Sequence, residues 1–268
     1  MTIQSRPGGR NVPVSSARCT FAAMALAFGA CALNAPMVCA HEGKAHEKGI
    51  RSEPAKAVSA PFDIVHTRIS TEGNKAVFHI AVSGKAGASK PTPSGKLAGS
   101  TVFSYVWPTS IDPFVVGFEA KSGILAFAVT AHPDFDDTPL FDESNDGDPG
   151  NDGEVWHSHW VVLQPDEACG KDALKVVDIV EGSKPRLPKT WPGLPILIDS
   201  PGWSPRFDGD SLEVRVPFDD IGVVAEAGFD GVTAALRVNA SVHSPLLCVA
   251  DVFKVASGDL SLPGKGDH

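Results

Sequence analysis

The chain has 268 residues, with 32 acidic and 23 basic side chains and a formal net charge of −9 at neutral pH. The first 40 residues hold three Arg and no acid, so the remainder carries 20 basic and 32 acidic groups, a net charge of −12. Such a surface repels nucleic acid and anionic lipid and favours cations as partners, metal ions among them. All three Met lie within the first 40 residues, which argues against a methionine-type copper(I) carrier.

The N-terminal segment has the order of a secretory signal peptide. Three Arg precede an apolar run from Phe21 to Leu33, and small residues then end at Ala40, after which we expect cleavage. The apolar run is too short and too interrupted for a membrane anchor. The sequence therefore predicts a signal peptide over residues 1–40, a periplasmic or secreted protein, and no membrane span in the mature chain.

The charged and small residues at 41–60 predict a mobile tail with little to bury. From residue 61, short apolar or alternating runs rich in β-branched and aromatic residues are separated by Gly, Pro, Asn and Asp, a pattern typical of strands and turns. The predicted strands are Phe62–Ser70, Lys75–Ser83, Thr101–Trp107, Ile124–His132, Val155–Leu163, Leu174–Glu181, Ser211–Val216, Val232–His243 and Leu247–Val255.

Gly73 marks a hairpin turn between the first two strands. Helical periodicity is confined to one or two turns at Asp219–Ala227, and six prolines between Pro185 and Pro205 predict a crossing loop. The fold class is therefore all-β, and we expect a single antiparallel β-sandwich over residues 61–258, followed by a C-terminal tail at 259–268.

Cys169 and Cys248 are the two cysteines that remain beyond the predicted signal peptide. In an oxidising compartment, two such cysteines most simply form one disulfide. Thiolate ligation of a metal is disfavoured because neither cysteine lies in a CxxC motif or beside a His.

The most informative segment is the acidic stretch Pro133–Glu154, which has 22 residues, nine carboxylates and no Lys or Arg. Its centre, Asp142–Asp148, resembles the DxDxDG-type calcium turns found outside EF-hands, with side-chain oxygens at positions 1, 3 and 5 and Gly at position 6. An EF-hand itself is excluded, because Gly153 occupies the twelfth position and no helices flank the loop. The predicted Ca²⁺ ligands are Asp142, Ser144, Asp146 and Asp148, completed by Asp152 or Glu154, or alternatively by Asp134, Asp136 and Asp137. A solvated acidic loop without metal is the alternative.

The strand after this loop carries His157 and His159, which project from one face because strand side chains alternate. Two such imidazoles suit Zn²⁺ or Cu²⁺. The string resembles the His-x-His-Trp strand of α-type carbonic anhydrases, but the resemblance extends only to ligand geometry. That family takes its third histidine from a nearby strand, whereas the candidates for a third ligand here are His132 and His243.

Cleavage after Ala40 would place His41 at the mature N-terminus, which is similar to the amino-terminal copper brace of lytic polysaccharide monooxygenases. Because a brace needs a terminus held against the fold, a weak metal-collecting tail containing His41 and His46 is the favoured interpretation. The sequence as a whole predicts a non-enzymatic exported metal-binding protein. The alternatives are a metal-dependent secreted enzyme, or a carbohydrate- or partner-binding β-sandwich that uses its five Trp and a structural Ca²⁺.

Overall fold

The computed structural model describes residues 49–92, 96–132, 142–149, 153, 155–239 and 246–267. The predicted signal peptide, with its cleavage site and His41, lies outside the described residues, as do Asp134, Asp136, Asp137, Asp152, Glu154 and His243. Within the described part of the chain, no helix is long and apolar enough to cross a membrane.

Strands dominate the described residues. The strands are β1 (Ile50–Arg51), β2 (Ile64–Glu72), β3 (Lys75–Val82), β4 (Thr101–Pro108), β5 (Ile124–Ala131), β6 (His157–Pro165), β7 (Leu174–Val176), β8 (Ile198–Asp199), β9 (Arg206–Asp208), β10 (Ser211–Pro217), β11 (Gly228–Phe229), β12 (Val232–Val238), β13 (Leu247–Val255) and β14 (Gly264–Lys265). The helical elements are α1 (Gly222–Glu226) and the 3₁₀ turns η1 (Ala60–Phe62), η2 (Pro113–Val116) and η4 (Glu167–Cys169).

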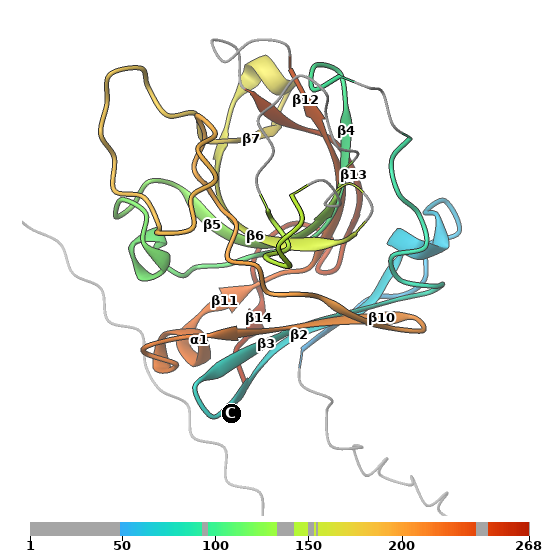
Figure 1. Ribbon diagram of the computed structural model, residues 1–268. Coiled ribbons are helices and arrows are strands. Elements are labelled where there is room, and N and C mark those ends of the chain that lie inside the picture. The colour runs from blue at the N-terminus through green and yellow to red at the C-terminus, as the bar shows by residue number, and fades with distance from the viewer. Residues whose placement is uncertain are drawn as a thin grey trace, which may run out of the picture. The chain divides into compact units, whose positions relative to one another are not determined.

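These strands form two main antiparallel sheets. The smaller sheet has the order β1-β2-β3-β10-β9, and the larger has the order β5-β4-β12-β13-β7-β6-β8. Because β5 also pairs with β6, six strands of the larger sheet close into a barrel, with β8 paired to β6 outside the ring. Figure 1 shows this ring of strands above the smaller sheet, with β5 and β6 on the side nearest to it.

The all-β prediction is confirmed, but the predicted sandwich of two open sheets is not. One sheet stays open while the other closes, which removes the two edges that a sandwich would leave. Strand alternation cannot distinguish these architectures, because a barrel and a sandwich both require one face of each strand to be buried.

A first hydrophobic core fills the space between the barrel and the smaller sheet. Its centre is aromatic: the ring of Phe127 on β5 lies 4.9 Å from that of Trp160 and 4.6 Å from that of Phe78. Trp107 and Trp160 are fully buried there. These two Trp therefore cannot supply the stacking surface that a carbohydrate-binding function requires.

A second core lies inside the barrel, built by the alternate residues of the same strands. Val102 and Val106 of β4, Ala128 of β5 and Val161 of β6 all belong to it. The two faces of β4, β5 and β6 are thus buried against different cores, and the interior face leads toward the candidate site.

Each of the nine predicted strands overlaps a strand of the structure, and the helical turn at α1 is confirmed. The Gly73 hairpin is also confirmed, since Glu72 pairs with Lys75 across it and Gly73 has a φ of 62°. The strands that the sequence missed are β1, β8, β9, β11 and β14. Each is two or three residues long, too short to show any periodicity.

Both predicted tails need correction where they are described. Ile50 and Arg51 form β1 and pair with the edge of β2, although the segment was expected to be mobile. Near the C-terminus, β14 pairs with β11, and Asp267 forms a bridge with Ser70. Edge pairing requires backbone donors and acceptors, which a polar segment supplies as well as an apolar one.

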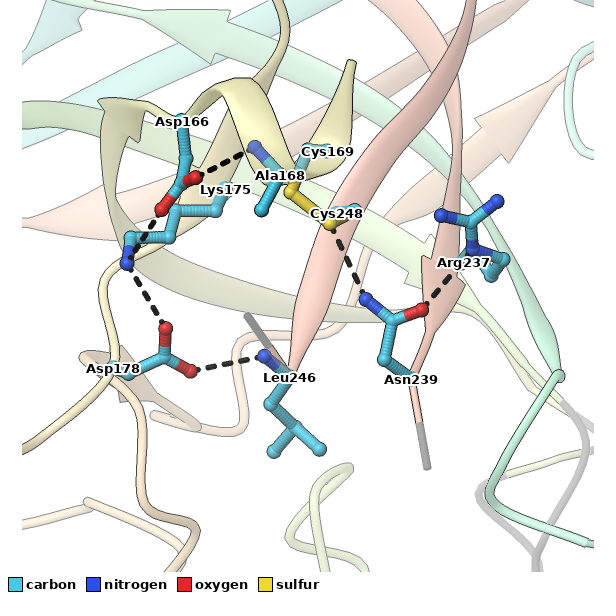
Figure 2. Close-up of a disulfide and its surroundings, with 9 residues drawn as sticks. All are labelled: Asp166, Ala168, Cys169, Lys175, Asp178, Arg237, Asn239, Leu246 and Cys248. Carbon is cyan, nitrogen blue, oxygen red and sulfur yellow. Dashed lines mark hydrogen bonds and ion pairs between the residues drawn. A yellow bond between two sulfur atoms is a disulfide. The ribbon is translucent and has the colours of Figure 1, made fainter. Parts of the chain in front are cut away.

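The predicted disulfide is present between Cys169 and Cys248, which lie 79 residues apart in the sequence. It joins η4 to β13 at the seam of the barrel, where β13 and β7 share a single register pair, Cys248 with Lys175. Figure 2 shows three further contacts beside this seam. The Lys175 ammonium binds the carboxylates of Asp166 and Asp178 at 2.9 and 3.1 Å, and Asp178 also accepts a hydrogen bond from the backbone of Leu246 at 2.9 Å.

Candidate metal centre

The pairing of β5 with β6 brings the predicted histidines together. Thr130 lies opposite His157, and Ala128 lies opposite His159, while His132 directly follows the end of β5. His157 and His159 are buried, and their rings lie 4.9 Å apart on the face of β6 opposite Trp160. The sequence prediction that His132 lies beside this strand is therefore correct.

Three side chains converge at this end of the barrel: His132, Glu143 and His157. Glu143 Oε2 lies 2.9 Å from His132 Nε2 and 3.2 Å from His157 Nε2. The two Nε2 atoms are 3.1 Å apart. Among the described residues, this is the one group of three His, Cys, Asp or Glu side chains whose ligand atoms are close enough to share a metal ion.

The size of this triangle matches the coordination of a transition metal. With metal–ligand bonds of about 2.0–2.1 Å, two ligand atoms lie about 3.3–3.4 Å apart in a tetrahedral site and about 2.9 Å apart when cis in an octahedral site. The three observed separations, 2.9, 3.1 and 3.2 Å, fall within or at the edge of this interval. One ion can therefore contact all three atoms after shifts of a few tenths of an ångström.

The electrostatics of the group also favour a cation. Burial raises the pKa of Glu143, but hydrogen bonds from His132 and His157 outweigh it and hold that pKa well below its usual value. Glu143 is therefore an anion at neutral pH, buried to 9% exposure. On the far side of the His157 ring, Nδ1 is buried and has no hydrogen-bond partner among the described residues. Converging lone pairs and a buried carboxylate are costly unless protons or a metal ion compensate them.

His159 lies beside the triad but is not part of it. Its Nδ1 is 3.1 Å from Ser200 Oγ and 3.3 Å from the backbone oxygen of Asp199, contacts that fix the ring. Burial, with smaller contributions from His157 and His132, lowers the pKa of His159 to about 3 against the opposing effect of Glu143. The imidazole is therefore neutral at physiological pH and adds no positive charge that would repel a metal ion.

The described part of the acidic loop does not gather its predicted calcium ligands into a comparable group. The Asp142 carboxylate accepts hydrogen bonds from the backbone N–H groups of Asp146 and Gly147 at 3.0 and 2.8 Å. Asp146 in turn accepts from the N–H of Asp148 at 3.0 Å, and both of these acids are exposed. Ser144 is partly buried, whereas Glu143 before it is buried and Asn145 after it is exposed. Calcium binding stays a prediction, since the ligands proposed to complete the site lie outside the described residues.

Glu143 is the one residue of the triad that the sequence analysis assigned no role. It occupies the second position of the calcium-like turn, between Asp142 and Ser144, and such turns take their ligands from positions 1, 3 and 5. The same pattern could have indicated a role for Glu143. If the side chains at positions 1, 3 and 5 of the turn point toward solvent, the side chain at position 2 points toward the protein. An acid at that position, in a loop that joins two histidine-bearing strands, is a ligand candidate.

The triad borders a cavity of about 190 Å³ inside the barrel. His132, Glu143 and His159 form part of its wall, and most of the rest is aliphatic. Comparisons of the chain with protein-family models, with curated proteins and with solved structures found no match. The chemistry of the triad and its surroundings is therefore the basis for assigning a function.

Proposed function

We propose that this is an exported metal-binding protein that holds one transition-metal ion through His132 Nε2, His157 Nε2 and Glu143 Oε2. The observation that carries the proposal is the triangle of these three atoms, with sides of 2.9–3.2 Å around a buried carboxylate. The Cys169–Cys248 disulfide supports an oxidising compartment such as the periplasm or the exterior. Glu143 thus takes the place among the ligands that the sequence predicted for His159, and His132 is the third ligand.

Two imidazoles and one carboxylate form a donor set of borderline hardness. Zn²⁺ and Cu²⁺, the metals expected from the sequence, both accept it, and Fe²⁺ is also bound by two His and one carboxylate in other proteins. The oxygen-rich turn around Asp142 and Asp146 is proposed as a separate Ca²⁺ site, because hard cations prefer such oxygens.

A metal-dependent enzyme is the second candidate function. A site with three protein ligands leaves at least one coordination position for water or substrate, as catalytic zinc sites do. The cavity beside His132 and Glu143 favours this candidate, since it offers space next to the metal ligands. A purely structural site would be expected to have four protein ligands.

Metal analysis of the mature protein tests the proposal. After metal removal and titration with Zn²⁺ or Cu²⁺, we expect one ion per chain by mass spectrometry and calorimetry. Glu143→Gln and His157→Ala should each weaken binding by about 100-fold or more, because even residues that only support ligands contribute about 10–100-fold. His79→Gln is the matched control, since His79 lies in the smaller sheet beside His66 and away from the triad.

Two outcomes separate the possible failures. If the two variants bind metal as tightly as the wild type and the control, the triad is not the site. Titration with Ca²⁺ of the wild type and of Asp148→Asn tests the loop independently, because Asp148 is exposed and lies outside the triad. Weaker Ca²⁺ binding by this variant, with Zn²⁺ binding retained, would establish two distinct sites.

A further inference from the structure

The barrel interior is hollow next to the proposed metal site. A narrow barrel normally fills its interior with side chains. Here small residues occupy several inward positions: Ser104 on β4, Ala128 on β5 and Ala234 on β12. Larger aliphatic side chains such as Val161 and Leu236 complete the wall. The remaining cavity of about 190 Å³ exceeds an engineered cavity of about 150 Å³ that binds benzene.

One end of this cavity is polar, and one hydroxyl there has no hydrogen-bond partner in the part of the chain that the structure describes. Ser104 Oγ donates a hydrogen bond to the backbone oxygen of Ala234 at 3.1 Å. Thr130 is only 8% exposed, and its Oγ1 is buried. In contrast to Ser104 Oγ, this atom has no hydrogen-bond partner among the described residues. Thr130 lies opposite His157 in the β5–β6 ladder and lines the cavity with His132. A buried hydroxyl without a partner is costly, and a ligand oxygen would satisfy it.

We propose that the barrel binds a small apolar monocarboxylate, with its hydrocarbon part among the aliphatic side chains and its carboxylate at the polar end. The inference rests on the proposed function, because the metal supplies the charge. A divalent ion beside the Glu143 carboxylate and neutral imidazoles leaves a local net charge of about +1, which attracts one anion. One carboxylate oxygen can fill an open coordination position while the other accepts a hydrogen bond from Thr130.

This arrangement explains the two properties of the cavity together. Its aliphatic wall selects for a hydrocarbon body by burial of apolar surface. The triad and Thr130 place the polar groups at a single end, so the ligand needs one anionic head and no second polar group. A sugar or a peptide would leave its other polar groups unsatisfied against the aliphatic wall.

The test compares benzoate with toluene, which has a similar hydrocarbon body and no carboxylate. Both are titrated by calorimetry into the full mature protein, once free of metal and once loaded with Zn²⁺, and bound metal is measured separately in each sample. We expect benzoate to bind the Zn²⁺-loaded protein at least about tenfold more tightly than the metal-free protein. Toluene should bind both forms equally, because it contacts only the aliphatic wall.

Two substitutions locate the ligand. Thr130→Val removes the hydroxyl at nearly constant volume, so benzoate binding should weaken severalfold while toluene binding is unchanged. Ala128→Leu fills the cavity and should abolish binding of both probes without loss of Zn²⁺. Ala234→Val, on a different strand, serves as a second cavity-filling variant if Ala128→Leu does not fold, and thermal unfolding with an intact disulfide verifies each variant.

The outcomes are distinguishable. If Zn²⁺ binds through the triad but benzoate does not bind, or binds equally without metal, the monocarboxylate proposal is overturned and metal binding stands. If toluene binds more tightly than benzoate in every form, the polar end does not recognise an anion, which also overturns the proposal. If Zn²⁺ binding does not depend on the triad, both the proposed function and this inference fail.

Discussion

Loss of the Cys169–Cys248 disulfide should destabilise the barrel strongly. The bridge closes a loop of about 80 residues, given the sequence separation of 79. In the chain-entropy treatment, opening such a loop raises the entropy of the unfolded chain by an amount equivalent to about 4.5 kcal/mol at 25 °C. We therefore expect the double variant Cys169→Ala/Cys248→Ala to lose about 3–4.5 kcal/mol of unfolding free energy.

The structure gives a reason for this loss to fall near the upper end of the range. The seam between β7 and β13 is held by one register pair, whereas β12 and β13 share seven. Without the disulfide, the hydrogen bond from the Leu246 N–H to Asp178 still links the two sides of this seam, while the Lys175 ion pairs to Asp166 and Asp178 lie on the β7 side of it. These contacts are partly exposed, and each contributes about 1 kcal/mol or less.

Urea unfolding monitored by Trp fluorescence measures the effect. A loss of 3–4.5 kcal/mol corresponds to a fall in Tm of about 6–18 °C for a domain of this size. Wild-type protein reduced with dithiothreitol should agree with the double variant within about 1 kcal/mol. Asn239→Ala is the matched control, since it removes side-chain contacts at the same place, the 3.4 Å contact to Cys248 Sγ and the 3.2 Å hydrogen bond from Arg237, but leaves the disulfide intact. A loss below about 1 kcal/mol in the double variant would refute the argument that the disulfide holds the seam.

Three further predictions concern a histidine of the smaller sheet, a buried ion pair and the first core. Burial, Arg68 and a neighbouring His lower the pKa of His79 to about 4, below its ordinary value of 6.5, so the unfolded chain binds this proton first. Stability should fall by about 1–2 kcal/mol as pH drops from 6.5 to 4, and His79→Gln should remove that part of the dependence in pH-resolved urea melts. Lys254→Met should cost about 2–3 kcal/mol in chemical unfolding, because it leaves Asp63, 3.1 Å from the Lys254 ammonium, buried without its cation. Trp160→Ala should cost about 3–5 kcal/mol by the same assay, since its ring is buried among aromatic neighbours. A loss below 1 kcal/mol for either substitution, or an unchanged pH dependence in His79→Gln, would contradict the packing described for that residue.

The strands could be predicted from the sequence because short runs of β-branched and aromatic residues are separated by Gly, Pro, Asn and Asp. Phe127 and Trp160 belong to one face of their strands, and Ala128 and Val161 belong to the other. Both faces are buried, one against the smaller sheet and one inside the barrel. Barrel closure depends on the pairing of β5 with β6, and local periodicity does not contain the information on which strands pair.

The candidate site was predictable in part for the same reason. The spacing of His157 and His159 fixes their common face, and the loop that joins their strand to His132 makes pairing of the two strands plausible. The third partner could not be derived from periodicity. Glu143 reaches the histidines through the conformation of a turn, which strand periodicity does not describe. Its neighbours match a calcium-binding turn, and ligands were therefore predicted only at the odd positions of that turn.

The acidic loop thus has a positioning role that its composition alone does not indicate. The Asp142 carboxylate binds two backbone N–H groups and fixes the turn, in which Asn145 and Gly147 adopt positive φ values of 57° and 95°. Because the turn is fixed on its exposed side, Glu143 is held on the opposite side, against His132. Since β5–β6 pairing sets the register of Thr130 with His157, barrel closure and the loop turn together determine the triad. A slip of one residue in that register would turn every inward side chain outward, so metal ligands and cavity wall depend on the same set of hydrogen bonds.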